Sequence, residues 1–156
     1  MISVGTTRLP GEQTQARLFI GIRTEFEAAH FWFDAPEEVA FLRAAHRHVF
    51  RVKLEMSVQH SDREKEFFLV QGALREFIQE EYLDRSPLPH VGTLPVISES
   101  CEVIAEKILI WAVEKYNGGR FPHLRWCRVT VSEDGENFGG AKWKYRGSRH
   151  HGQADS

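Results

Sequence analysis

Hydrophobic and polar residues alternate in two segments near the N-terminus, residues 18–30 and residues 46–59. From Phe50 to Val58 every second residue is apolar, and the residues between them are polar or charged. A period of two residues is typical of a β-strand with one face against a core and the other in water. We therefore predict two strands of an antiparallel sheet.

The spacing of apolar residues becomes helical in the middle of the chain. Over residues 67–83 and again over residues 100–116 they recur every three or four positions, which predicts two helices. Residues 84–97 hold three of the six prolines, so we expect a loop between the helices. Ser98 or Ser100 can cap the second helix at its start.

Alternation returns near the C-terminus, over residues 124–133, and a short fourth strand is expected at residues 141–145. Turn residues lie between these strands, from Asp134 to Asn137 and at the pair Gly139-Gly140. The predicted order is strand, strand, helix, helix, strand, strand. It indicates an α+β fold in which a four-stranded antiparallel sheet carries both helices on one face.

One domain, residues 17–147, contains all of these elements. The N-terminal arm at residues 1–16 and the tail at residues 148–156 are polar and show no periodicity, so we expect both to be flexible. Of the 156 residues, 42% are hydrophobic and 27% are charged. This composition supplies enough apolar material for a core and excludes a chain that is mainly disordered.

Charge and cysteine content exclude several classes of partner. The formal net charge of −2 gives no basic excess for nucleic acid. No apolar run approaches the roughly 18 residues of a membrane span, and the N-terminus has no apolar signal core. Two cysteines, Cys101 and Cys127, give no disulfide framework. We therefore expect a cytoplasmic protein without nucleic-acid or membrane partners.

Three of the eight histidines can meet on neighbouring strands. His46 and His48 are two residues apart on a predicted strand and so point to the same face. His30 ends the preceding strand, and antiparallel pairing can bring it beside them. Three imidazoles with one open position are the pattern of a catalytic zinc site. The alternative for His46 and His48 is an ordinary polar surface.

Glu133 ends the third predicted strand with the same parity as the apolar residues Val129 and Val131. Its side chain is therefore expected on the covered side, where an unpaired carboxylate is costly. An arginine or two N–H groups of a planar heterocycle can satisfy it there. The alternative is a solvated carboxylate at a strand end.

Four motifs occur along the chain in a fixed order: Phe26-Glu27-Ala28-Ala29-His30, His46-Arg47-His48, Ser100-Cys101-Glu102-Val103-Ile104-Ala105 and Val129-Thr130-Val131-Ser132-Glu133. Together they resemble the 6-pyruvoyl-tetrahydropterin synthase family, which includes the bacterial 6-carboxytetrahydropterin synthases of queuosine synthesis. The resemblance covers roughly residues 18–145. It implies the tunnelling fold, in which small β-β-α-α-β-β subunits assemble into a barrel.

The resemblance also implies a site. It implies zinc at His30, His46 and His48, with Arg47 where the family has glycine. It implies that Glu133 anchors the amino-pyrimidinone edge of a pterin or related purine, and that Glu102 helps to line the pocket. A homo-oligomer, trimer-based or hexameric, with sites at subunit interfaces is expected, and pairing between subunits would cover the open edges of the sheet.

Two departures from the family concern catalysis. The catalytic cysteine of the family lies four residues before the first histidine of the pair, and this chain has Leu42 there. The family's Asp-His pair corresponds to Pro89-His90, so that His90 alone remains to transfer protons. A leucine can neither carry a proton nor attack a carbon.

Replacements for the missing cysteine are available. Cys101 lies at the start of the second helix, where the helix N-terminus lowers the pKa of a thiol; the alternative is a small buried core residue. Some family members use a glutamate near the cysteine position, which makes Glu37 and Glu38 candidates, with a solvated surface as their alternative.

Two functions follow from these observations. The first is a zinc-dependent 6-pyruvoyl-tetrahydropterin synthase-like lyase of pterin or 7-deazapurine biosynthesis. It would act on a dihydropterin triphosphate or a related purine-derived substrate, with His90 and Cys101 as catalytic candidates. The second is a catalytically inactive family member that binds or sequesters a pterin, purine or nucleotide. Leu42 and Pro89 favour the second, whereas the three histidines and Glu133 favour the first.

Overall fold

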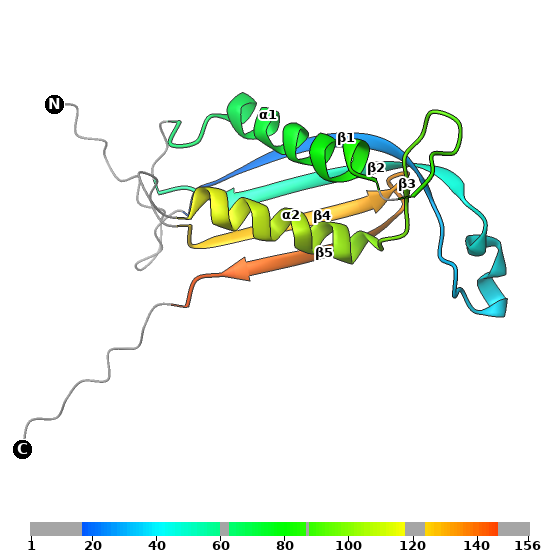
Figure 1. Cartoon of the computed structure of the whole chain (residues 1–156). Coiled ribbons are helices and arrows are strands. Elements are labelled where there is room, and N and C mark those ends of the chain that lie inside the picture. The colour runs from blue at the N-terminus through cyan, green and yellow to red at the C-terminus, as the bar shows by residue number, and fades with distance from the viewer. Residues whose placement is uncertain (1–16, 60–62, 87, 118–123, 147–156) are drawn as a thin grey trace, which may run out of the picture.

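The computed structural model describes residues 17–59, 63–86, 88–117 and 124–146, so the predicted arm and tail lie outside the described residues. Two helices lie on one face of a sheet (Figure 1), as predicted for the α+β class. The long strands are β1 (Phe19–His30), β2 (His46–Ser57), β4 (Trp126–Glu133) and β5 (Asn137–Lys144). The helices are α1 (Phe67–Ile78) and α2 (Cys101–Tyr116).

The sheet has five strands instead of the predicted four. The additional strand, β3 (Val96–Ile97), runs parallel to β1, and the strand order is β3-β1-β2-β4-β5. The Ala29 N–H donates to the Pro95 carbonyl at 2.9 Å, which begins this pairing. Two residues are too few to display a period, so the alternation of the sequence could not reveal β3.

The hairpin between β4 and β5 is tighter than predicted. The Glu136 N–H donates to the Glu133 carbonyl at 3.1 Å across Asp134 and Gly135. Both intervening residues are left-handed, with φ of 51° and 81°, as in the tight turns that Asp-Gly pairs favour. The prediction that Gly139-Gly140 belongs to the turn is wrong, because both glycines lie within β5 and pair with β4.

Side-chain caps fix where both helices begin. The Glu66 carboxylate accepts a hydrogen bond from the Leu69 N–H at 3.1 Å at the start of α1. The Ser100 hydroxyl accepts one from the Val103 N–H at 3.4 Å at the start of α2. Such bonds satisfy N–H groups that have no partner within the helix. Ser100, not Ser98, is therefore the cap.

Two irregular helical segments complete the chain between the strands. A π-helical turn, η2 (Gln79–Asp84), extends α1, so that the two together cover the range predicted for one helix. A 3₁₀ segment, η1 (Glu37–Arg43), lies between β1 and β2. Within the described residues, no helix is long and apolar enough to cross a membrane.

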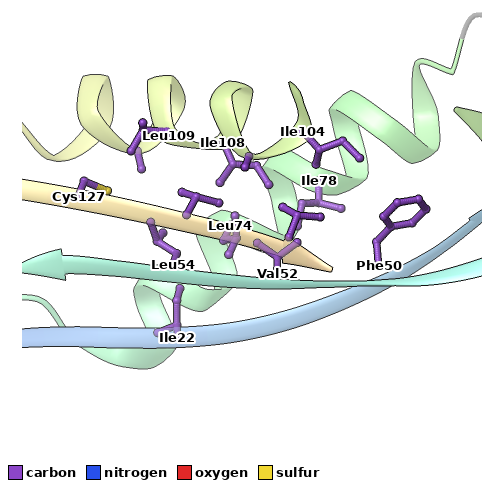
Figure 2. Packing of buried hydrophobic residues seen from close by; sticks show 14 of the residues in the cluster. Ile22, Phe50, Val52, Leu54, Leu74, Ile78, Ile104, Ile108, Leu109 and Cys127 are labelled. Atoms are coloured by element: carbon purple, nitrogen blue, oxygen red, sulfur yellow. The ribbon is translucent and has the colours of Figure 1, made fainter. Parts of the chain in front are cut away.

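The core lies between the helices and the apolar face of the sheet. Figure 2 shows side chains of α1 and α2 packed onto those of β1, β2 and β4. The helices supply Leu74, Ile78, Ile104, Ile108 and Leu109, and the strands supply Ile22, Phe50, Val52, Leu54 and Cys127. The alternation that predicted the strands therefore places their apolar parity against the helices.

One end of the sheet collects the residues that the sequence marked as functional. There β1 ends at His30, β2 begins at His46, β4 ends at Glu133 and α2 begins at Cys101. The register pairs His30 with His46 across β1 and β2. This end lies near the β3 label in Figure 1.

Replacing Leu74 by alanine should lower the free energy of unfolding by about 2–5 kcal/mol, because the side chain is 0% exposed and its removal leaves a cavity. Leu69→Ala on the same helix is the matched control, since Leu69 is 75% exposed. Urea unfolding of both variants measures the difference. Equal losses in the two variants would contradict the placement of α1.

Candidate functional site

Three histidine rings meet where β1 ends and β2 begins. The ring centroids of His46 and His48 are 4.6 Å apart, and His30 lies 6.0 Å from His48 and 6.4 Å from His46. In the register of β1 and β2, His30 is opposite His46 and Ala28 is opposite His48. Antiparallel pairing therefore brings the three imidazoles together, as the parity of the sequence predicted.

Hydrogen bonds orient two of these rings through the same nitrogen. Nδ1 of His48 lies 2.6 Å from Oδ2 of Asp134, and Nδ1 of His46 lies 2.7 Å from the Ala44 carbonyl oxygen. A carboxylate and a carbonyl can only accept, so in both rings Nδ1 carries the proton. The lone pair of Nε2 is then left to bind a ligand, as in metal-bound histidines held by an outer acceptor.

Two buried nitrogens at this place have no hydrogen-bond partner among the described residues: Nε2 of His30 and Nε2 of His48. One ring nitrogen of each histidine and one carboxylate oxygen of Glu133 lie within 4.8 Å of one another. An unsatisfied buried polar atom costs about 1–3 kcal/mol, so two of them on neighbouring rings mark a place built for a ligand. A borderline metal such as zinc fits the two histidine nitrogens, whereas His46 is not part of this group.

The charge state of His30 also suits metal binding. Burial lowers the pKa of His30, the Glu133 carboxylate and the Glu99 backbone oppose this effect, and the nearby His48 and His46 reinforce it. The ring is therefore neutral at neutral pH, which is the form that binds a metal. Glu133 lies close to both rings, with Oε1 at 3.2 Å from Nδ1 of His30 and Oε2 at 3.8 Å from Nε2 of His48.

Asp134 is a functional residue that the sequence analysis missed. Its carboxylate accepts the Val49 N–H at 2.9 Å as well as the His48 Nδ1–H. These two bonds and the positive charge of Arg51 lower the pKa of Asp134, although its slight burial works against them. Its left-handed φ of 51° turns the side chain back toward β2. The Asp-Gly pair predicted a turn, but nothing in the sequence indicated that the carboxylate reaches His48.

A cavity of about 530 Å³ opens beside His30, and neither His46 nor His48 lines it. Four of the predicted site residues line it, namely His30, Cys101, Glu102 and Glu133. Leu42, at the position of the missing cysteine, lines the same cavity, and so do two exposed aromatic side chains, Trp32 and Phe138. The volume is within the range of small-molecule sites.

His90 does not join this group in the described part of the chain. Its side chain is exposed in the loop before β3, and it is not among the residues that line the cavity. Glu133 also lacks the arginine that the sequence analysis allowed for, since its close side-chain contacts within the described residues are with the rings of His30 and His48. Its carboxylate remains partly accessible, at 27% exposure.

Glu102 is held at the first turn of α2. Hydrogen bonds from its own backbone N–H and from the Ser100 hydroxyl lower the pKa of Glu102, so the carboxylate is ionised. Gly139 of β5 packs directly on it. A Cβ at Gly139 would lie 2.8 Å from the Glu102 nitrogen, so glycine is required there for α2 to reach the sheet.

Cys101 is half-buried at the start of α2, and its two predicted alternatives, a catalytic thiol and a small core residue, both stay predictions. Burial, followed by the negative charges of Glu133 and Glu102, raises the pKa of Cys101 to about 11. These effects outweigh any lowering by the helix N-terminus. Glu37 and Glu38 are both exposed on η1, and Glu37 pairs with Arg43 at 3.1 Å.

One comparison with known proteins assigns most of the chain to a family. Residues 19–141 match the family model described as 6-pyruvoyl tetrahydropterin synthase. The search of curated proteins found no match.

Solved structures with the same fold come from two malaria parasites. The 6-pyruvoyl tetrahydropterin synthase of Plasmodium vivax matches with a TM-score of 0.57 and 15% identity, over 84% of this chain and 100% of that one. A variant of that protein with its catalytic residue Glu replaced by Ala matches with a TM-score of 0.58, 15% identity and the same coverage. The Plasmodium falciparum enzyme matches with a TM-score of 0.56 and 13% identity, again over 84% and 100%.

These identities are low, so the structural likeness establishes the fold, which is the tunnelling fold that the motifs implied. The family model covers more than half of the chain. The chain therefore belongs to the 6-pyruvoyl tetrahydropterin synthase family.

Proposed function

We propose that this chain is a zinc-dependent 6-pyruvoyl-tetrahydropterin synthase-like enzyme that acts on a dihydropterin triphosphate or a related purine-derived substrate. The observation that carries the proposal is the group of His30, His48 and Glu133, in which Nε2 of each histidine is buried and has no hydrogen-bond partner in the described part of the chain. His30 and Glu133 also line the cavity. The product of this reaction would enter pterin or 7-deazapurine biosynthesis, including the synthesis of queuosine. The two free cysteines, Cys101 and Cys127, suit a reducing cytoplasm.

His30, His46 and His48 would hold the zinc. Bound there, zinc would polarise a hydroxyl or carbonyl of the substrate side chain. The Ala44 carbonyl and the Asp134 carboxylate support this assignment, because they leave Nε2 of His46 and His48 as the free ring nitrogens.

Glu133 and Glu102 would hold the heterocycle. A carboxylate can accept two parallel N–H bonds, which matches the amino-pyrimidinone edge of a pterin. Glu133 is suited to this role because its carboxylate faces the cavity without an arginine partner in the described residues. Glu102, ionised at the start of α2, lines the same cavity.

Within the described residues, a single chain places few proton-transferring side chains at the cavity. Leu42 occupies the cavity wall where a cysteine would act. We propose that the protein is a homo-oligomer with sites at subunit interfaces, so that the exposed His90 of one subunit serves the cavity of another. The catalytic glutamate named for the P. vivax protein supports Glu37 or Glu38 as a further candidate, since both lie on η1 with Leu42.

The second candidate function is a family member that binds or sequesters a pterin, purine or nucleotide without turnover. Two observations favour it: Leu42 lines the cavity, and the pKa of Cys101 is about 11, so that the thiol is not a ready nucleophile at neutral pH. The cavity and Glu133 serve binding as well as catalysis.

Incubating the zinc-loaded protein with dihydroneopterin triphosphate distinguishes the two functions. The enzyme should release inorganic triphosphate and a new pterin, and Glu133→Gln should lower kcat/KM about 10- to 100-fold, because a charge-assisted hydrogen bond is lost. Glu136→Gln, in the exposed turn nearby, is the matched control and should keep the wild-type rate. Tight binding without product supports the second function, and neither binding nor product contradicts both.

Cys101 should react slowly with iodoacetamide. A thiol with a pKa of about 11 is mostly protonated at neutral pH, so its alkylation rate should rise about tenfold for each pH unit between 7 and 9 without a plateau. Peptide mass spectrometry distinguishes the alkylated Cys101 peptide from the alkylated Cys127 peptide, and Cys101→Ser should abolish the signal of the Cys101 peptide. A plateau below pH 8 would show an activated thiol and return Cys101 to the catalytic candidates.

Asp134→Asn should weaken zinc binding about 10- to 100-fold, because the orienting acceptor of His48 loses its charge. Asparagine tolerates the left-handed backbone at this position, so the turn should persist. Competition with a chromophoric chelator gives the zinc dissociation constant without any substrate. If Asp134→Asn and Glu136→Gln bind zinc equally well, Asp134 does not position His48.

A further inference from the structure

A lysine of α2 joins that helix to η2 and to the segment that precedes α2. Nζ of Lys107 donates to the Glu99 carboxylate and, at 3.3 Å, to Oε1 of Glu81 on η2. The same ammonium group lies 5.8 Å from the ring centroid of Tyr82, also on η2. The hydrogen bond with Glu99 raises the pKa of Lys107, so the cation that links these segments keeps its charge.

The segment held by Lys107 forms one wall of the cavity beside His30. Residues 98–102 contribute Ser98, Ser100, Cys101 and Glu102 to that cavity. Ser98 also lines a second cavity, of about 330 Å³, which Glu99 and Lys107 line as well. The segment therefore separates the two cavities, and Lys107 contacts it from the side of the second one.

The same segment reaches the ring of His30. In the parallel pairing of β1 with β3, His30 is opposite Ile97, and the Phe31 N–H donates to the Ile97 carbonyl at 3.3 Å. Two residues further along, the backbone of Glu99 forms a hydrogen bond that raises the pKa of His30. An outer hydrogen bond of this kind fixes the tautomer and the orientation of a metal-binding histidine. The position of Glu99 therefore affects how His30 is held.

A stack of aromatic rings gives a second connection between η2 and the histidines. The ring of Tyr82 stacks on Phe26 with centroids 5.5 Å apart, and Phe26 stacks on Phe50 at 5.2 Å. Phe50 in turn packs edge-on against His30 and His48. All three stacked side chains are buried. Because a close-packed interior leaves little free volume, a displacement of Tyr82 is passed on to the histidine rings.

We propose that Lys107 is a positioning residue for the histidine site: its ammonium group holds Glu99 and Tyr82, and through them it fixes the ring of His30. The proposal rests on the proposed function, because it gives Lys107 a part in shaping the metal site named there. An ordinary surface ion pair contributes little, but Lys107 is half-buried and binds two carboxylates from two different segments.

Loss of the ammonium group would leave the Glu99 carboxylate poorly satisfied. Its Oε2 is already buried without a hydrogen-bond partner in the described part of the chain, and its Oε1 is the acceptor for Lys107. A partly buried carboxylate that loses its cation turns toward water. Because Glu99 lies within residues 98–102, this movement would displace the cavity wall and release the ring of His30.

Zinc titration of the full-length protein, in competition with a chromophoric chelator, gives the first test. Lys107→Met removes the charge and keeps most of the side-chain length, so it should weaken zinc binding about tenfold. Lys107→Arg keeps the charge and should stay within about threefold of the wild-type affinity. Glu99→Gln weakens the same bond from its other partner and should act in the same direction as Lys107→Met. Lys115→Gln, on the exposed side of α2, is the matched control and should leave the affinity unchanged.

Long-range ¹H–¹⁵N spectra of the metal-free protein give the second test, because they report histidine tautomers without zinc or substrate. His30 should show a single tautomer in the wild type and in Lys107→Arg, and a mixture of tautomers in Lys107→Met. His48, which Asp134 orients separately, should keep its tautomer in all variants. A change confined to His30 distinguishes positioning from a general loss of structure, and circular dichroism checks that each variant is folded.

The two tests separate this proposal from the proposed function. Wild-type zinc affinity together with an unchanged His30 tautomer in Lys107→Met would overturn the role of Lys107 and leave the metal site standing. Absence of zinc binding in every protein, with the tautomer change still confined to His30, would contradict the proposed function and support the role of Lys107. Equal changes in Lys107→Met and Lys115→Gln would overturn the proposal.

Discussion

The register between β1 and β2 is the constraint on which the rest of the structure depends. The two strands pair without interruption from Phe19 opposite Ser57 to His30 opposite His46. A slip of one residue would turn every side chain of one strand to the other face. It would expose Phe50, Val52 and Leu54, which form the core with the helices, and it would move His46 and His48 away from His30. The burial of the core stabilises this register, and the same register brings the three histidines together.

The sheet separates two chemically different surfaces. On the helix side, the apolar layer ends at the histidine cluster, where Phe50 packs edge-on against His30 and His48 with ring centroids 5.8 and 6.0 Å apart. On the other side, the strand residues that point away from the helices carry mostly basic side chains. The Asp134-Gly135 turn lies between the two, because the Asp134 carboxylate binds His48 while its carbonyl accepts a bond from Arg51 at 3.4 Å. A tight turn thus supports the site and borders the basic face.

Much of this arrangement could be predicted from the sequence, because the segments that follow the strand period and the helix period are long. The strands β1, β2 and β4 follow from alternation, and the helices follow from the spacing of apolar residues. The meeting of His30 with His46 and His48 follows from parity and antiparallel pairing alone. The motifs add the family, and the family model confirms it.

What could not be predicted depends on contacts between distant residues. β3 has two residues and no period, and Gly139 serves close packing against Glu102 instead of a turn. Asp134 reaches His48 across 86 positions of the chain. The raised pKa of Cys101 follows first from burial and then from the carboxylates of Glu133 and Glu102, neither of which local sequence reveals. The zinc ligands, the roles of His90 and Cys101, and the oligomer remain proposals.

The most direct test of the account is zinc titration of the metal-free protein, followed by X-ray absorption spectroscopy of the loaded form. The account predicts about one zinc per chain, bound by imidazole nitrogens without sulfur. His46→Ala should abolish tight binding, whereas Glu133→Gln and His90→Ala should retain it, since the first alters the heterocycle anchor and the second a residue outside the cavity. Zinc that survives His46→Ala but is lost with Glu133→Gln would contradict the three-histidine site and assign the metal to His30, His48 and Glu133.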